Sequence, residues 1–246
     1  MAEGCDYSFD RPNVTALWAA GIRFAGRYYG LGSESKLTHT WEQTALSNMG
    51  ISLFNLAEEY PTSALGGFGK GTLHAIKVLA DMDAKGVPSN RPAYFAVDFD
   101  VTTSQWPAVR DYFAGINSIL PLDRIGIYGG IRAMQWAQRD GSARWFFQTY
   151  AWSSGRVFPD VHVLQYSNGH YVGGGKVDYC RSYKDDFGQW AGVLLPPAPP
   201  PSDYIPGRID PGVDYVQDID ALSGNYGTRA GTVDAYARDL DGLRTL

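Results

Sequence analysis

Short apolar runs recur along the first 180 residues, and nearly all of them end in a polar residue. Their length and their content of Val, Ile, Phe and Tyr are typical of β-strands. Eight runs have this character, at 3–8, 24–30, 51–59, 93–100, 124–130, 145–152, 161–167 and 175–180. Helical spacing of apolar residues lies between the early runs, over 12–20, 40–49, 72–85, 104–119 and 131–139.

Strands that alternate with helices predict an α/β fold with a parallel sheet. Eight strands within fewer than 200 residues predict a compact (β/α)8 barrel of the TIM type, in which some of the late helices are reduced to loops. An open doubly wound sheet is the alternative. That fold usually carries a glycine-rich nucleotide fingerprint after its first strand, and the fingerprint is missing here.

The pattern changes at residues 193–206, where six prolines in fourteen positions favour an extended linker. Beyond it, residues 207–230 are rich in turn formers, whereas 232–243 carry apolar residues at helical spacing and predict one amphipathic helix. The expected organisation is a barrel over 1–192, a Pro-rich linker over 193–206 and a short helical tail over 207–246.

Polar residues at the ends of the apolar runs form a candidate site. In a closed parallel barrel these ends lie at one rim, the face where barrel enzymes keep their active sites. Crowded acids raise one another's pKa and do not help a fold, so their convergence favours a functional pocket. The residues expected there are Asp6, Glu58 or Glu59, Asp98, Asp100, Tyr128, Gln148, Tyr150, Trp152, Gln165 and Asp178.

Composition narrows the function classes. The 246 residues are 44% hydrophobic and carry a net charge of −5, without a Lys/Arg cluster, so nucleic acid and anionic membrane surfaces are not predicted as partners. No apolar run reaches the ~18 residues of a membrane span, and the N-terminus lacks the pattern of a signal peptide. Four scattered histidines and two cysteines give no metal-ligand spacing, and we predict neither a metal nor a cofactor.

Two motifs receive a structural interpretation. The stretch "GGFGKGT" at 66–72 departs from a phosphate loop, because Gly71 separates Lys70 from Thr72, and it predicts a turn before a helix. Cys5 and Cys180 lie on the first and last strands. If the acids next to them face inward, alternation turns Cys5 outward and Cys180 inward, so no disulfide is expected.

The motifs "CDYS", "YFAVDFD", "GIYGG", "LQYS" and "KVDYC", in this order over residues 4–190, resemble the glycoside-hydrolase-like domain DUF1906, a relative of the family 25 lysozymes. The resemblance implies a barrel that binds a β-linked amino-sugar polymer, usually peptidoglycan, at its C-terminal rim. In the lysozymes an Asp-x-Glu motif on the fourth strand cleaves the glycan. Carried over by position, Asp100 is the proton donor and Asp98 the stabilising carboxylate, and Asp6 and Asp178 complete the acidic ring.

One departure from the lysozyme pattern weakens the expectation of catalysis. Asp100 stands where the lysozymes have Glu, and the missing methylene withdraws the carboxyl by about 1.5 Å, a bond length. A misplacement of about 1 Å can cost on the order of 100-fold in rate. Glu58 or Glu59 is the longer acid nearby, and strand alternation allows only one of them to face the rim centre. Tyr128, Tyr150 and Trp152 are expected to stack on sugar rings, and Gln148 and Gln165 to hydrogen-bond the glycan.

Two functional classes follow. The first is a lysozyme-like hydrolase of cell-wall polysaccharide. The second is a non-catalytic or weakly catalytic bacteriophage virion protein that contacts cell-surface glycan through the barrel, with residues 207–246 binding a protein partner or a second copy. The shortened acid and the missing signal peptide favour the second class. The expected location is the virion if the protein is phage-encoded, and otherwise the cytoplasm until release.

Overall fold

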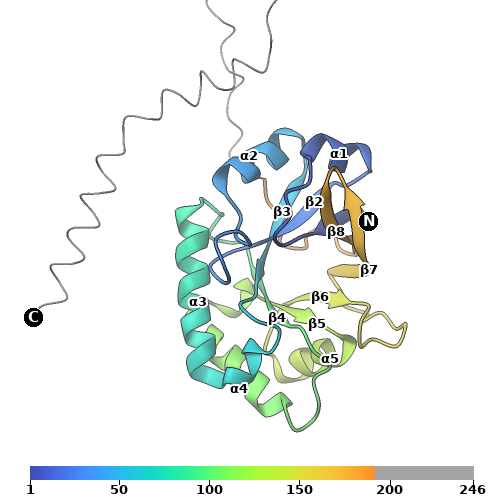
Figure 1. Ribbon diagram of the computed structural model, residues 1–246. Coiled ribbons are helices and arrows are strands. Elements are labelled where there is room, and N and C mark those ends of the chain that lie inside the picture. The colour runs from blue at the N-terminus through green and yellow to red at the C-terminus, as the bar shows by residue number, and fades with distance from the viewer. Residues whose placement is uncertain (192–246) are drawn as a thin grey trace, which may run out of the picture. The chain divides into compact units, whose positions relative to one another are not determined.

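The computed structural model describes residues 1–191, which form a closed eight-stranded barrel in the order β1 to β8 (Figure 1). The predicted α/β barrel is therefore confirmed. Because residues 192–246 lie outside the described part, so do the predicted linker and tail helix. The strands are β1 (Glu3–Asp6), β2 (Phe24–Tyr28), β3 (Ser52–Ala57), β4 (Ala93–Val97), β5 (Ile125–Gly129), β6 (Trp145–Thr149), β7 (Val163–Val172) and β8 (Gly175–Ser182).

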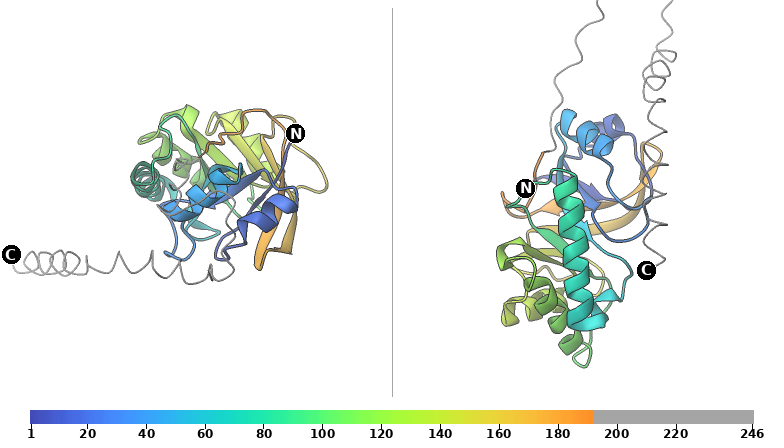
Figure 2. Two further views of the ribbon diagram at one scale, coloured as in Figure 1. Left: turned by 90° about the horizontal axis from the view of Figure 1, so that it is seen from above. Right: turned by 90° about the vertical axis from the view of Figure 1, so that its left-hand side faces the viewer.

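Each of the first five strands is followed by a helix, as the spacing of apolar residues predicts. The helices are α1 (Val14–Ala19), α2 (Thr40–Asn48), α3 (Gly67–Ala84), α4 (Trp106–Asn117) and α5 (Ile131–Asp140), with short 3₁₀ turns η1 (Ser63–Gly66) and η2 (Leu122–Arg124). Figure 2 shows α3 running the length of one side of the barrel. After β6 and β7 the described chain has loops in place of helices. No helix within residues 1–191 is long and apolar enough to cross a bilayer.

The expectation that all eight strands are parallel is wrong for β8, which pairs antiparallel with both β7 and β1. The physical reason is the connection between β7 and β8. Only Gly173 and Gly174 separate the two strands, and both have positive φ, 56° and 82°. Such a two-residue turn joins antiparallel strands, whereas a parallel partner needs a crossover of roughly a dozen residues.

Helix α3 begins at Gly67, five residues before the predicted start at 72. Gly67, Gly69 and Gly71 of "GGFGKGT" belong to this helix, and Gly71 lets it approach α4. A Cβ on Gly71 would lie 1.9 Å from the carbonyl oxygen of Tyr112, and one on Gly115 would lie 2.1 Å from that of Phe68. Gly71 therefore serves close packing between two helices, and the low helix propensity of the glycines before it explains why the sequence misplaces the start of α3.

An aromatic cluster fills the barrel interior near the N-terminal ends of the strands. Phe54 lies at its centre, with its ring centroid 5.3 to 6.1 Å from those of Phe24, Tyr94, Phe147 and Phe187 in edge-on contacts. Edge-to-face packing of this kind is favourable beyond area burial. The cluster closes the N-terminal end of the barrel, so the open space that remains inside the strands lies near the C-terminal rim.

Most of the hydrophobic core lies between the strands and the surrounding helices. Cys5 belongs to this outer layer, whereas Cys180 belongs to the barrel interior, and both are buried free thiols. The predicted opposite orientation of the two cysteines is confirmed. Burial raises the pKa of both thiols, which makes them poor nucleophiles.

Candidate functional site

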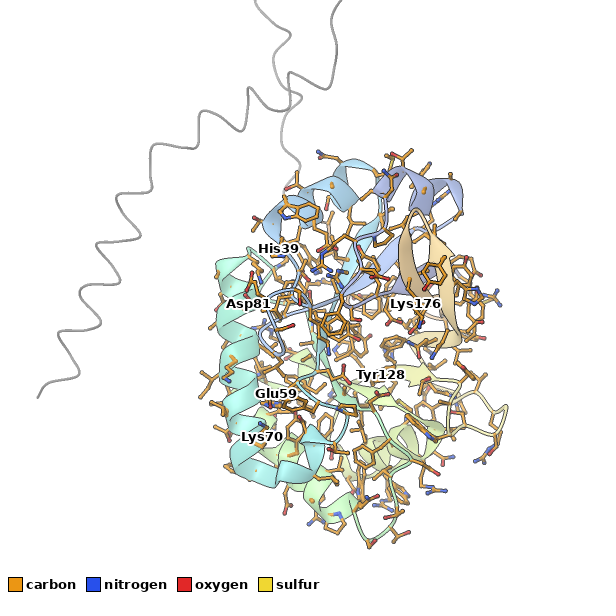
Figure 3. The ribbon with its side chains drawn as sticks, viewed as in Figure 1. His39, Glu59, Lys70, Asp81, Tyr128 and Lys176 are labelled. Atoms are coloured by element: carbon orange, nitrogen blue, oxygen red, sulfur yellow. The ribbon has the colours of Figure 1, made fainter. Side chains whose placement is uncertain are left out.

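A cavity of about 160 Å³ opens at the C-terminal rim of the barrel. Tyr94 and Phe147 of the aromatic cluster line it together with Leu56, Ala57 and Ala96. Its polar lining consists of Asp6, Tyr28, Glu58, Asp98, Tyr128, Gln165, Asn168 and Asp178. Among the side chains labelled in Figure 3, Tyr128 is the one that belongs to this cavity.

Four acids reach the cavity from four strands. Asp6 is the last residue of β1, and Glu58 and Asp98 are the first residues after β3 and β4. Asp178 arrives by a different route, because β8 runs in the opposite direction and the register pairs Asp178 with Asp6. The strand ends and one antiparallel pairing therefore concentrate negative charge in one small space.

Gln165 joins two of these acids. Its amide nitrogen donates to Asp6 at 2.8 Å and to Asp178 at 3.4 Å, while its oxygen accepts from the Tyr128 hydroxyl at 3.0 Å. The Cys180 thiol donates to the same Asp6 oxygen at 3.2 Å. Both N–H groups of the buried Gln165 amide and one lone pair of its oxygen thus have partners, so the network holds Asp6 and Asp178 in fixed positions.

Burial raises the pKa values of three acids in the cavity, and the charges of neighbouring acids add to this effect at Asp6 and Asp98. Burial, followed by the Asp178 charge, raises the pKa of Asp6 to about 7. Burial, followed by the Glu58 charge, raises the pKa of Asp98 to about 6. Burial also raises the pKa of Asp178, against a hydrogen bond from the Gly169 amide. Carboxyl groups that hold a proton near neutral pH are suited to acid catalysis.

Glu58, and not Glu59, faces the cavity. The Glu58 carboxylate forms an ion pair with Lys36, whose ammonium lies 2.5 Å from Oε2. Glu59 turns away and pairs with Lys70 of α3, and its Oε2 lies 3.3 Å from Nε2 of the buried His74. Figure 3 shows Glu59 and Lys70 together beside α3. The sequence left open which of the two glutamates faces the cavity. In the folded chain Lys36 pairs with Glu58 at the cavity, and Lys70 pairs with Glu59 beside α3.

Asp100 does not share the cavity with the other acids, which corrects the expectation that all four aspartates converge. Strand β4 ends at Val97 and the chain bends at Phe99, so alternation carries Asp98 into the cavity but no longer applies at Asp100. The Asp100 carboxylate is exposed and lies 3.5 Å from the Arg132 guanidinium at the start of α5.

Three further predicted residues lie outside the cavity lining, and all belong to β6 or the loop after it. Gln148 faces outward and is fully buried, where it donates to the Arg156 carbonyl and accepts from the Phe158 amide, each at 2.7 Å. It therefore shapes the loop that follows β6. Tyr150 and Trp152 lie on this loop with 49% and 40% of their surface exposed.

Sequence reasoning missed Tyr28, Asn168 and Lys36. Tyr28 ends β2 as a polar strand end, which is a signal that could have found it. Asn168 enters because β7 extends past the predicted end at 167 into the hairpin. Lys36 lies in the loop between β2 and α2, where no periodicity marks it, and only the tertiary contact with Glu58 reveals it.

Two wider clefts lie at the same rim as the cavity. One of about 610 Å³ shares Asp6 and Asp178 with it and extends to Phe9 and Lys176, the latter labelled in Figure 3. Another of about 520 Å³ is lined by Phe9, Tyr60 and Lys36, among others. The first cleft thus extends the cavity past Asp6 and Asp178, whereas the second shares no lining residue with the cavity. Within residues 1–191, no group of three or more His, Cys, Asp and Glu side chains is placed to hold a metal ion.

The sequence model of the Rv2525c-like, glycoside hydrolase-like domain matches residues 15–185. The chain belongs to this family. It is 27% identical over 182 residues to a protein of Mycobacterium tuberculosis named "Putative peptidoglycan hydrolase Rv2525c", a match that spans 72% of this chain and 75% of the relative. The crystal structure of the Tat-secreted protein Rv2525c with L-tartrate has a TM-score of 0.72 at 26% identity, and covers 77% of this chain and 99% of that one.

More distant structures share the fold of this Rv2525c-like domain. A muramidase from Acremonium alcalophilum matches with a TM-score of 0.50 at 16% identity, over 75% of this chain and 95% of that one. A family 25 glycosyl hydrolase from Bacillus anthracis matches with a TM-score of 0.50 at 14% identity, over 76% of this chain and 90% of that one. The glycoside hydrolase-like barrel inferred from the sequence motifs is therefore confirmed.

Proposed function

We propose that this Rv2525c-like domain binds and hydrolyses the glycan strands of peptidoglycan in the rim cavity. The observation that carries the proposal is the convergence of Asp6, Glu58, Asp98 and Asp178 in one open cavity. A stable fold has no use for four acids in so small a space, whereas glycoside cleavage needs paired carboxyl groups. The name of the mycobacterial relative supports peptidoglycan as the substrate.

The electrostatics of the cavity fit this chemistry. Hydrolysis of a glycosidic bond needs a neutral carboxyl group that protonates the leaving oxygen and an ionised carboxylate that faces the positive charge developing on the sugar. The raised pKa of Asp98, about 6, and that of Asp6, about 7, let these groups keep a proton at mildly acidic to neutral pH. Acids with ordinary pKa values would be ionised there.

Binding of a longer glycan would use the rim around the cavity. Tyr128 and Gln165 are proposed to contact the sugar at the cleavage point, since both line the cavity. Tyr150 and Trp152 lie on the exposed loop after β6, at the same end of the strands, and are proposed to stack on sugar units farther along the strand. Gln148 would act only through the shape of this loop.

Glycan binding without efficient cleavage is the second candidate function, and the position of Asp100 favours it. The residue that aligns with the lysozyme acid faces Arg132 instead of the cavity. The secreted nature of Rv2525c supports action at the cell wall over a cytoplasmic role. The virion role and an assembly role for residues 207–246 stay predictions.

The two candidates are separated by one experiment on the full chain. Purified protein is incubated with insoluble peptidoglycan, and both the bound fraction and the released reducing ends are measured. Hydrolysis predicts release that rises with time and disappears in the Asp98→Asn variant, while binding persists. Binding without release selects the second candidate, and neither binding nor release contradicts the proposal.

A further inference from the structure

We infer that the catalytic pair spans two strands, with Glu58 after β3 as the carboxylate that stays ionised, Lys36 as the residue that positions it, and Asp98 after β4 as the proton donor. This inference rests on the proposed hydrolysis. It differs from the arrangement implied by the lysozyme resemblance, in which both acids follow the fourth strand.

The contacts of Lys36 support an ionised Glu58. Lys36 is only 7% exposed. Its ammonium lies 2.5 Å from Glu58 Oε2 and donates to the Glu58 carbonyl at 3.2 Å, and it sits 4.2 Å from the centre of the Tyr28 ring. A buried ammonium needs a negative partner, because removing one member of a buried pair leaves an uncompensated charge. Glu58 therefore enters the cavity as an anion held in place.

Asp98 is the acid best placed to give up a proton. It is partly exposed to the cavity, whereas Asp6 is 4% exposed and its Oδ2 is occupied by Gln165 and Cys180. Asp178 is likewise tied to the Gly169 amide at 2.7 Å.

The groups that face Asp98 come from several elements. Glu58 after β3 and Asp178 of β8 raise its pKa, while Lys36 before α2 and the Tyr128 side chain of β5 lower it. Burial and the two negative neighbours raise the pKa of Asp98 more than Lys36 and Tyr128 lower it, so the carboxyl retains its proton to about pH 6. A carboxyl group that retains its proton beside a carboxylate that is paired with a lysine is a suitable arrangement for an acid and its ionised partner.

The reaction can be balanced with these groups and water. Asp98 transfers its proton to the glycosidic oxygen, the bond between that oxygen and the anomeric carbon breaks, and the leaving sugar departs as an alcohol. Glu58 faces the positive charge that develops on the remaining sugar. A water molecule then adds to the anomeric carbon and gives its proton to Asp98, which restores the acid.

Glu59 offers a matched control, since it is adjacent in sequence, has the same side chain and also pairs with a lysine, but outside the cavity. With peptidoglycan as substrate, Glu58→Gln and Asp98→Asn should each lower the rate of reducing-end release by about 100-fold or more, whereas Glu59→Gln should stay within about threefold of wild type. Asp100→Asn tests the rival arrangement and should also stay close to wild type.

A titration of Asp98 by carboxyl-carbon NMR provides a readout that does not need turnover. Removing the Glu58 charge by Glu58→Gln should lower the pKa of Asp98, Lys36→Met should raise it, and Glu59→Gln should leave it unchanged. A merely structural role for Lys36 would not produce opposite shifts in the two variants.

The outcomes separate this inference from the proposed function. An active wild type whose Glu58→Gln variant is equally active overturns the inference and leaves hydrolysis standing. Loss of activity in Asp100→Asn with retention in Asp98→Asn also overturns it. A wild type that binds peptidoglycan without releasing reducing ends refutes the proposed hydrolysis itself, and with it the roles assigned to this pair.

Discussion

Loss of the Asp6 proton should make the barrel less stable as the pH rises, and Asp6→Asn should remove this dependence. Asp6 is 4% exposed and has a pKa of about 7 in the folded protein, against 3.8 as the ordinary value. The folded state therefore holds the proton more tightly than the unfolded chain. Asn has the same shape and keeps an oxygen that can accept from Gln165 and Cys180, so the substitution changes the charge more than the packing.

The magnitude follows from the two pKa values. The stability that comes from the bound proton is fully present below the unfolded pKa of 3.8 and is lost as the pH rises through the folded pKa of about 7. Each unit of pKa difference corresponds to about 1.4 kcal/mol, so the whole loss is roughly 4 kcal/mol. Between about pH 5 and about pH 8, a single titrating group with these values loses about 2.6 kcal/mol.

Urea unfolding of both proteins at about pH 5 and about pH 8, followed by tryptophan fluorescence, measures this effect. Other groups titrate in both proteins and largely cancel when the variant is compared with wild type at each pH. The free energy of unfolding of Asp6→Asn relative to wild type should increase by about 2 to 3 kcal/mol from the lower to the higher pH. A relative stability that is the same at both pH values would refute the assignment of a raised pKa to Asp6.

Three further expectations concern packing and binding. Gln165→Leu should lower the free energy of unfolding by about 2 to 4 kcal/mol, because the buried Asp6 and the half-buried Asp178 lose a donor and the Tyr128 hydroxyl loses its acceptor. A loss below about 0.5 kcal/mol in urea unfolding would contradict the network. Gly71→Ala should lower the free energy of unfolding by more than about 2 kcal/mol, because the added Cβ would clash with a backbone carbonyl of α4. Gly69→Ala in the same helix is the control: its Cβ meets nothing within 4 Å, and the substitution should raise the free energy of unfolding by about 0.5 to 1 kcal/mol in thermal unfolding. Phe9 is 61% exposed in the cleft that shares Asp6 and Asp178 with the cavity, so Phe9→Ala should weaken binding of soluble glycan fragments by about fivefold in calorimetry. The free energy of unfolding should change by less than about 0.5 kcal/mol, and unchanged affinity would exclude this cleft from the binding surface.

The order and type of the elements were accessible from the sequence because they depend on local patterns. Apolar runs separated by helical spacing identify eight strands and five helices, and a barrel is the compact way to bury so many apolar strands. The presence of Asp6 and Asp98 in the cavity was also predictable. Each stands at or just after the end of a strand, where the backbone is still extended enough for alternation to set the direction of the side chain.

The direction of β8 and the final membership of the cavity were decided by tertiary structure. Strand direction depends on the connection, and two glycines with positive φ turn β8 back against β7. Alternation fails once the chain bends at Phe99, so Asp100 follows the Arg132 charge out of the cavity. Glu58 lies in the cavity, where Lys36 from the loop after the neighbouring strand β2 pairs with its carboxylate. Side chains beyond a strand end are directed by charges and contacts that only the folded chain brings together.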